Sequence, residues 1–89
     1  MKLKVGHLYK VRKYLSGFNS ENRNDKNIKI YCLEKGEIIC ILKSPEEIFE
    51  VNGYSYFRTQ LLNNNNQILY LFQPRSEIDS LQELFIHLK

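Results

Sequence analysis

The sequence predicts a small, mostly β fold: a five-stranded barrel with a C-terminal α-helix. Three observations lead to this fold class. Short apolar runs are separated by polar turn signals, a spacing typical of antiparallel strands joined by hairpins. Apolar residues near the C-terminus instead recur at helical spacing. The length of 89 residues suits one modest core. We therefore expect a single domain, residues 1–89, with its helix at about 77–88.

The first strand is expected from Leu8 to Leu15, where apolar residues loosely alternate with Lys and Arg. The next segment, Ser16–Asn27, is rich in Asn, Ser and Asp and predicts a loop. Such a loop is long for a small domain, and long loops often carry function. It is either a binding loop or a tolerated insertion, and the sequence does not separate the two.

The stretch Ile28–Leu42 is interpreted as a central hairpin, because two apolar runs flank the turn signal Glu34–Glu37. A three-residue loop would place Gly36 in the left-handed region, where glycine has no steric cost. This register pairs Cys32 with Ile38, Ile30 with Cys40, and Ile28 with Leu42. Both faces are apolar, so we expect the hairpin to be covered on both sides. A two-residue Lys35-Gly36 turn is the competing register.

Cys32 and Cys40 both fall in this predicted hairpin, on one face but not directly opposite each other. A disulfide is therefore not favoured. Two cysteines at this spacing do not form a zinc motif. We expect two buried free thiols and a cytoplasmic protein. No signal peptide or membrane-spanning apolar run is visible in the sequence, so no membrane association is expected.

The central hairpin is expected to end near Pro45, because proline cannot donate to a strand ladder. Asn52-Gly53 then lies between the apolar segments Ile48–Val51 and Tyr54–Leu62, which is the strongest short hairpin signal. A two-residue turn there pairs Val51 with Tyr54, Phe49 with Tyr56, and Ile48 with Phe57.

Four asparagines, Asn63–Asn66, predict the next turn, since Asn tolerates left-handed geometry. The last strand is expected from Gln67 to Phe72. A four-residue loop would pair Leu61 with Ile68, Thr59 with Tyr70, and Phe57 with Phe72. The face expected to form the core then comprises Phe57, Leu61, Ile68, Tyr70 and Phe72.

Pro74 is expected to end the sheet, and Ser76 with Asp79 resembles a capping box at the start of a helix. The apolar stripe of this helix comprises Ile78, Leu81, Leu84, Phe85 and Leu88. We expect the stripe to close one end of the sheet. The alternative is that it docks on a partner or on a second copy, which would make the protein a homo-oligomer.

The sequence carries no recognisable catalytic constellation. His7 and His87 lie near opposite ends of the chain, and the cysteines are expected to be buried. Glu46 and Glu47 are adjacent on a strand pattern, so their carboxylates point to opposite faces. No glycine-rich phosphate loop is present. We expect a protein that is not an enzyme, with no cofactor and no metal.

Two surfaces are candidates for binding. With the predicted core face inward, the outward residues combine aromatic and basic side chains suited to a protein interface, namely Tyr54, Tyr56, Arg58 and Phe49. The alternative is that the helix or the long loop covers this face. The first 29 residues carry eight basic and two acidic side chains (8 − 2 = +6), against a net −3 (5 − 8) for the remainder. The candidate nucleic-acid-binding residues are Lys2, Lys4, Lys10, Arg12, Lys13, Arg23 and Lys29.

The first function hypothesis is therefore a protein-binding module. The abundance of Asn, Ile and Lys and the lack of Ala suggest an AT-rich genome, such as that of a phage or mobile element, whose protein binds or inhibits a host protein. The second is a nucleic-acid-binding barrel. The third is a binder of small molecules or nucleotides between protomers.

The segment Leu33–Ile39 resembles the diverging-turn signature of the Src-homology-three-like small barrels, an apolar residue followed by Lys-Gly-acid-Ile-Ile. Leu8-Tyr9 lies where the first strand of that family begins, and a long loop follows. Two further segments are similar to the start of the third strand and the turn after the fourth, Gly53–Phe57 and Pro74–Ser76. Tyr54 replaces the Trp of the peptide-binding members. The resemblance implies this barrel fold and not proline-rich peptide binding.

Overall fold

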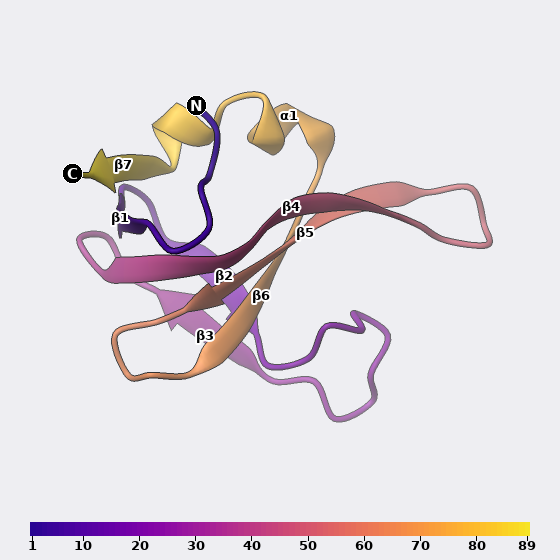
Figure 1. The fold of residues 1–89 in the computed structure, drawn as a ribbon. Helices are drawn as coiled ribbons and strands as arrows, with labels where there is room; N and C mark the ends of the chain where they lie inside the picture. The colour runs from indigo at the N-terminus through magenta and orange to yellow at the C-terminus, as the bar shows by residue number, and fades with distance from the viewer.

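The computed structural model describes residues 1–89 and shows one antiparallel sheet that curls into a half-barrel (Figure 1). Its seven strands lie in the order β3-β2-β6-β5-β4-β1-β7. The strands are β1 (Leu8–Val11), β2 (Leu15–Phe18), β3 (Ile30–Leu33), β4 (Ile38–Phe49), β5 (Ser55–Leu62), β6 (Ile68–Gln73) and β7 (Phe85–Leu88). The mostly β prediction is confirmed, whereas the predicted number of five strands is too small.

The predicted first strand, Leu8–Leu15, is two strands in the structure. β1 pairs with β4 and β7, whereas β2 pairs with β3 and β6. The break follows Val11: the Arg12 amide still donates to the Leu84 carbonyl at 2.7 Å, in the β1–β7 register, and β2 begins only at Leu15. Because β2 includes Ser16–Phe18, the polar loop occupies residues 19–29 and not Ser16–Asn27.

The predicted hairpin Ile28–Leu42 is wrong, because β3 and β4 do not pair with each other. The turn itself is present: the Glu37 amide donates to the Glu34 carbonyl at 3.0 Å, and Gly36 has a φ of +92°. The backbone of Val11 bonds to this turn. Its carbonyl accepts from the Gly36 amide at 2.7 Å, and its amide donates to the Glu37 carbonyl at 2.9 Å. The backbone of β1 thus takes the hydrogen bonds that a hairpin would have needed.

This topology changes the environment of both cysteines. Cys32 lies opposite Ser16 and is exposed, and Cys40 lies opposite Leu8 and is half-buried. Both thiols are free. The prediction that the two cysteines belong to the core is wrong, because both lie on the outward face of the sheet. The expected coverage of both faces is therefore also wrong.

The β4–β5 hairpin is confirmed, but its register is displaced by one residue. Phe49 pairs with Ser55, because the loop has three residues and ends at Gly53, with a φ of +88°. β4 also continues through Pro45 and does not end there. Register shifts around Lys43 show that the ladder is irregular at this point, where a proline is tolerated.

The β5–β6 hairpin shows the same displacement. Asn66 has a left-handed φ of 59°, and Leu62 pairs with Ile68. A one-residue slip exchanges the two faces of a strand. The inward side chains are therefore Thr59, Leu61, Leu69 and Leu71, all buried. Of the predicted core face only Leu61 is buried; Phe57, Tyr70 and Phe72 are half-buried, and Ile68 is exposed.

The predicted helix at 77–88 is wrong. The chain forms one short helix, α1 (Arg75–Ile78), a 3₁₀ turn, η1 (Leu81–Glu83), and then β7. No side chain caps α1. β7 pairs with the open edge of β1 over four residue positions, hydrogen bonding that a helix would not provide. Three residues of the predicted apolar stripe are nevertheless buried in the core: Leu81, Leu84 and Phe85.

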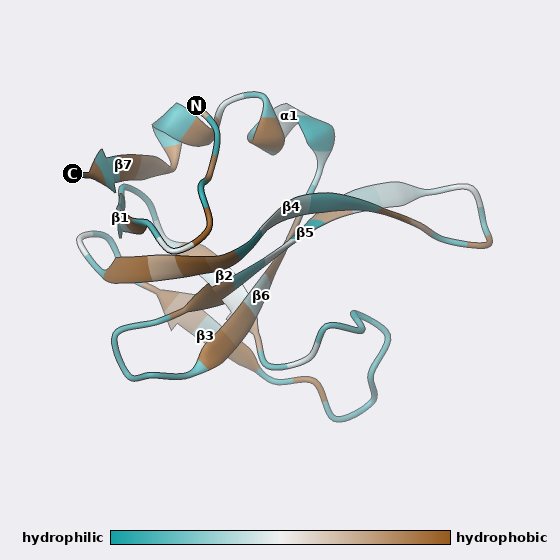
Figure 2. Ribbon diagram, in the orientation of Figure 1, coloured by the Kyte–Doolittle hydropathy of each residue, from teal (hydrophilic) through white to brown (hydrophobic).

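The core lies inside the curl of the sheet and is closed by the N-terminal segment and the C-terminal turns. Figure 2 shows the apolar residues concentrated on the strands and the polar residues on the connections. The ring of Tyr9 is fully buried, and its hydroxyl accepts from the Lys4 amide at 2.8 Å, which fixes the N-terminal segment. Neither helix is long or apolar enough to cross a membrane.

Candidate functional site

The β4–β5 hairpin projects from the body of the molecule as an arm (Figure 1). Three apolar side chains at its end form what we call the hairpin tip: Phe49, Val51 and Tyr54, with exposed fractions of 76, 111 and 73%. None of the three belongs to the hydrophobic core. The tip is therefore an exposed group of large apolar side chains on a protruding element.

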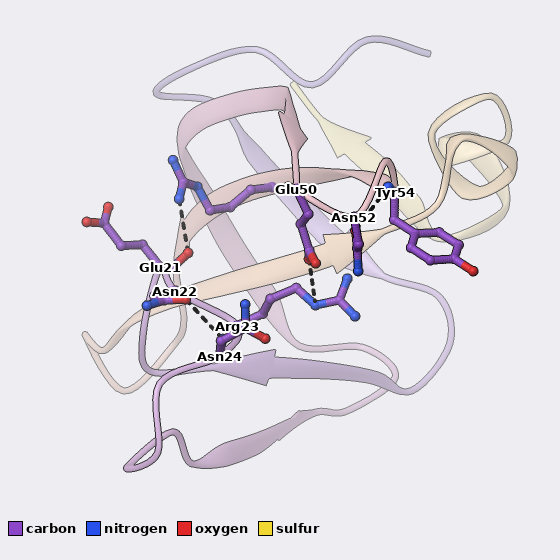
Figure 3. Close-up of polar contacts among 8 residues, drawn as sticks. Glu21, Asn22, Arg23, Asn24, Glu50, Asn52 and Tyr54 are labelled. Carbon is purple, nitrogen blue, oxygen red and sulfur yellow. Dashed lines mark hydrogen bonds and ion pairs between the residues drawn. The ribbon is translucent and has the colours of Figure 1, made fainter.

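Backbone hydrogen bonds order the hairpin tip. The Glu50 amide donates to the Tyr54 carbonyl at 2.8 Å, and the Gly53 amide donates to the Glu50 carbonyl at 3.0 Å. The Asn52 Oδ1 accepts from the Tyr54 amide at 3.1 Å (Figure 3). Asn favours this local bonding, which is why the Asn-Gly pair makes a defined turn. The loop therefore presents Tyr54 from a fixed backbone.

The structure does not bring the four predicted protein-binding residues together. Phe49 and Tyr54 lie at the hairpin tip, but Tyr56 is only 8% exposed. The Tyr56 ring meets Phe72 edge-on, with centroids 5.6 Å apart, and the Arg23 guanidinium lies 4.7 Å from its centroid. Tyr56 therefore supports the fold and is not available to a partner.

Arg58 is half-buried and is held by two groups of the chain. Its Nη2 donates to the Glu46 Oε1 at 2.7 Å, and its Nη1 donates to the Glu21 carbonyl at 3.0 Å. The hydrogen bond to Glu46 is the main cause that raises the pKa of Arg58, against the opposing effect of burial. Arg58 thus fixes the loop of residues 19–29 to β5.

The loop of residues 19–29 covers part of the outward face of the sheet. It reaches the arm at Arg23, whose Nε lies 3.5 Å from the Glu50 Oε1 (Figure 3). Beneath it lies what we call the aromatic cluster: Phe18, Tyr56 and Phe72, with the Phe18 and Phe72 ring centroids 5.2 Å apart. The sequence left open whether the helix or the loop covers this face, and the structure shows the loop.

All seven basic residues predicted to bind nucleic acid are exposed, but they do not form one surface. Lys10, Arg12 and Lys13 line a depression of about 700 Å³ beside the Glu34–Glu37 turn, which we call the basic depression. The Arg12 Nη1 donates to the Gln82 carbonyl at 3.1 Å, which positions this guanidinium at the rim. Lys2, Lys4, Arg23 and Lys29 do not line it, and Arg23 is engaged by Tyr56 and Glu50.

Two features of this end of the molecule were missed by sequence reasoning. Lys35 lines the basic depression from the Glu34–Glu37 turn, so four cations face one acid, Glu83. None of the four cations takes part in an ion pair. The predicted hairpin placed Lys35 in its loop, and the hydrogen bonds of the Val11 backbone to Gly36 and Glu37 are what bring this turn beside Lys10.

The second missed feature is a histidine pair. The Nδ1 of His7 lies 2.8 Å from the Nε2 of His87, and the His87 ring stacks on Tyr9 with centroids 4.8 Å apart. Desolvation, followed by the nearby positive charges of His7, Lys4 and Lys89, lowers the pKa of His87. No group of three or more His, Cys, Asp or Glu side chains is placed to hold a metal ion. No signal in the sequence links the two ends of the chain.

No known protein family, curated protein or solved structure matches this chain. The function proposed below therefore rests on the geometry of the hairpin tip and of the basic depression.

Proposed function

We propose that this chain is a non-enzymatic protein-binding module that inserts its hairpin tip into a partner. The observation that carries the proposal is the exposure of Phe49, Val51 and Tyr54 at the end of a projecting arm. Aromatic side chains of this kind dominate binding energy when they fill a pocket of a partner. The composition that favours a phage or mobile element makes a host protein the partner class, which the chain binds or inhibits.

The test compares affinity capture from a host lysate by the wild type and by Phe49→Ala/Tyr54→Ala. We expect one dominant protein to be captured by the wild type and its recovery to fall at least about tenfold with the variant. Ile30→Ala is the matched control, since Ile30 is a large apolar residue that is 68% exposed but lies on β3. Unchanged recovery by the double variant would contradict the proposal, and equal melting temperatures would show that folding is unaffected.

A second candidate function is nucleic-acid binding at the basic depression, favoured by its four unpaired cations. Labelled DNA and RNA oligonucleotides would be titrated at several salt concentrations. Binding to phosphates should weaken steeply with salt, and Arg12→Ala/Lys13→Ala should reduce the slope by about 1 to 2. Binding that persists at high salt would argue against this function.

The Src-homology-three-like assignment is also a proposal. Its support is that β3 and β4 diverge at Glu34–Glu37 and pair with different strands, as the diverging-turn resemblance implies. A cytoplasmic location is proposed on the two free thiols, Cys32 and Cys40.

A further inference from the structure

The strand register aligns apolar side chains across the outward face of the sheet. Leu62 pairs with Ile68 and with Cys40, and Leu8 pairs with Cys40 and with Leu88. One row therefore crosses five adjacent strands, β6-β5-β4-β1-β7, with an apolar residue at every position. We call it the aliphatic row: Ile68, Leu62, Cys40, Leu8 and Leu88. The first four members each alternate along their strand with a core residue, and Leu88 lies at odd spacing from the core residue Phe85, so all five point away from the core.

The aliphatic row is only partly covered by the chain, because three of its members are half-buried (Leu62, Cys40 and Leu88) and two are exposed. Leu8 and Ile68 are 47 and 50% exposed. The adjacent row, Ile38–Lys10–Ile86, adds two more apolar side chains that are each 44% exposed. Single exposed apolar residues are ordinary, but a register-aligned group on one face indicates an interaction surface.

The charges on this face indicate the chemistry of the occupant. The row on the other side of the aliphatic row is Tyr70–Gln60–Lys43. Across these three rows the charged residues are Lys10 and Lys43, and neither has an ion-pair partner. A second copy docked face to face would bring these lysines toward lysines. Aliphatic side chains flanked by unpaired cations are instead complementary to apolar side chains flanked by carboxylates.

We propose that the aliphatic row is a second protein-docking surface, and that it binds an amphipathic segment of a partner that carries Leu, Ile or Phe beside Asp or Glu. This surface is separate from the hairpin tip and goes beyond the function proposed for the tip. With both surfaces occupied, the chain would connect two proteins.

The test is a selection from a random peptide library displayed on phage. The wild-type protein is the target, and Leu8→Ser/Ile86→Ser is used for counter-selection. We expect the enriched peptides to combine apolar and acidic residues, and to bind the counter-selection variant at least about tenfold more weakly by fluorescence anisotropy. Peptides without acidic residues, or peptides that bind both proteins equally, would overturn the proposal.

Two further variants make the result specific. Lys10→Glu/Lys43→Glu leaves the aliphatic row intact, so it should lose the acidic peptides and bind their Lys-substituted versions. Phe49→Ala/Tyr54→Ala should bind the acidic peptides like the wild type, which separates this surface from the hairpin tip. Sedimentation equilibrium should show a monomer. A dimer that Leu8→Ser/Ile86→Ser dissociates would assign the surface to a second copy and overturn the proposed occupant.

Discussion

The outward face of the sheet has two halves that differ in how far the rest of the chain covers them. One half carries the aromatic cluster, which lies under the loop of residues 19–29. The other half carries the aliphatic row, which is partly open, with Leu8 and Ile68 exposed. Both halves include residues of β5 and β6, separated by only a few positions along each strand. The difference shows that the strand pattern alone does not decide burial on this face; the single long loop does.

Two polar groups of the loop hold it over the aromatic half. The Arg23 guanidinium lies over the Tyr56 ring, and the Glu21 carbonyl accepts from Arg58. No comparable cation or carbonyl of the chain is directed at the aliphatic row. We therefore expect substitutions in the aromatic half to change stability, and those in the aliphatic half to change binding.

The largest effect is expected for Tyr56→Ala, in the covered half. Removing this buried ring leaves a cavity beside Phe72 and removes the contact with Arg23. The free energy of unfolding, measured in urea, should fall by about 3 kcal/mol. Tyr14→Ala is the matched control, because Tyr14 is 71% exposed, and it should change stability little. Equal effects of the two substitutions would show that the loop does not bury the aromatic half in solution.

Arg23→Ala tests the cover itself. The substitution removes the guanidinium over the Tyr56 ring and the ion pair with Glu50. We expect a loss of about 1 kcal/mol, because partly exposed contacts of this kind are individually modest. Lys26→Ala, in the same loop and without an ion-pair partner, should be close to neutral. In Tyr56→Ala the effect of Arg23→Ala should shrink, since the shared contact is already lost.

Much of the fold could be predicted from local signals. The Asn52-Gly53 and Asn63–Asn66 segments located two hairpins, since each signal is contained within a few residues. Their registers were displaced by one residue because a short loop can close with two, three or four residues, and only packing of the inner face selects among them. Of the four predicted protein-binding residues, the structure exposes two, Phe49 and Tyr54.

The features that could not be predicted all depend on contacts between distant segments. The predicted Ile28–Leu42 hairpin does not form, because the backbone of Val11 bonds to Gly36 and Glu37. The predicted C-terminal helix does not form, because residues Phe85–Leu88 pair as β7 with the edge of β1. Helical spacing of apolar residues also fits a short helix, a turn and a strand in succession. The aliphatic row likewise forms only when five strands pair in register, so no single segment of the sequence predicts it.

A smaller, pH-dependent effect is expected at the open β1–β7 edge, where His7 and His87 meet. Because the folded state lowers the pKa of His87 below its ordinary 6.5, the unfolded chain binds this proton more readily. Stability is therefore full above about pH 6.5 and should fall as the pH drops through the folded pKa. His87→Gln should flatten this dependence below about pH 6.5, as measured by urea unfolding. His7→Gln should flatten it less, since desolvation is the larger cause. If stability depended on pH equally in His87→Gln and in the wild type, His87 would not be the cause of this dependence.

The smallest effect on stability is expected for Leu8→Thr, in the middle of the aliphatic row. Leu8 is already 47% exposed, and Thr retains the strand preference of a β-branched residue. We expect the free energy of unfolding to change by no more than about 0.5 kcal/mol. The same replacement on the inner face, Leu61→Thr, should be strongly destabilising, because Leu61 is fully buried. A large loss for Leu8→Thr would mean that this half of the face supports the fold as the aromatic cluster does. A neutral result leaves a row of apolar side chains that folding does not require, and that a binding partner would explain.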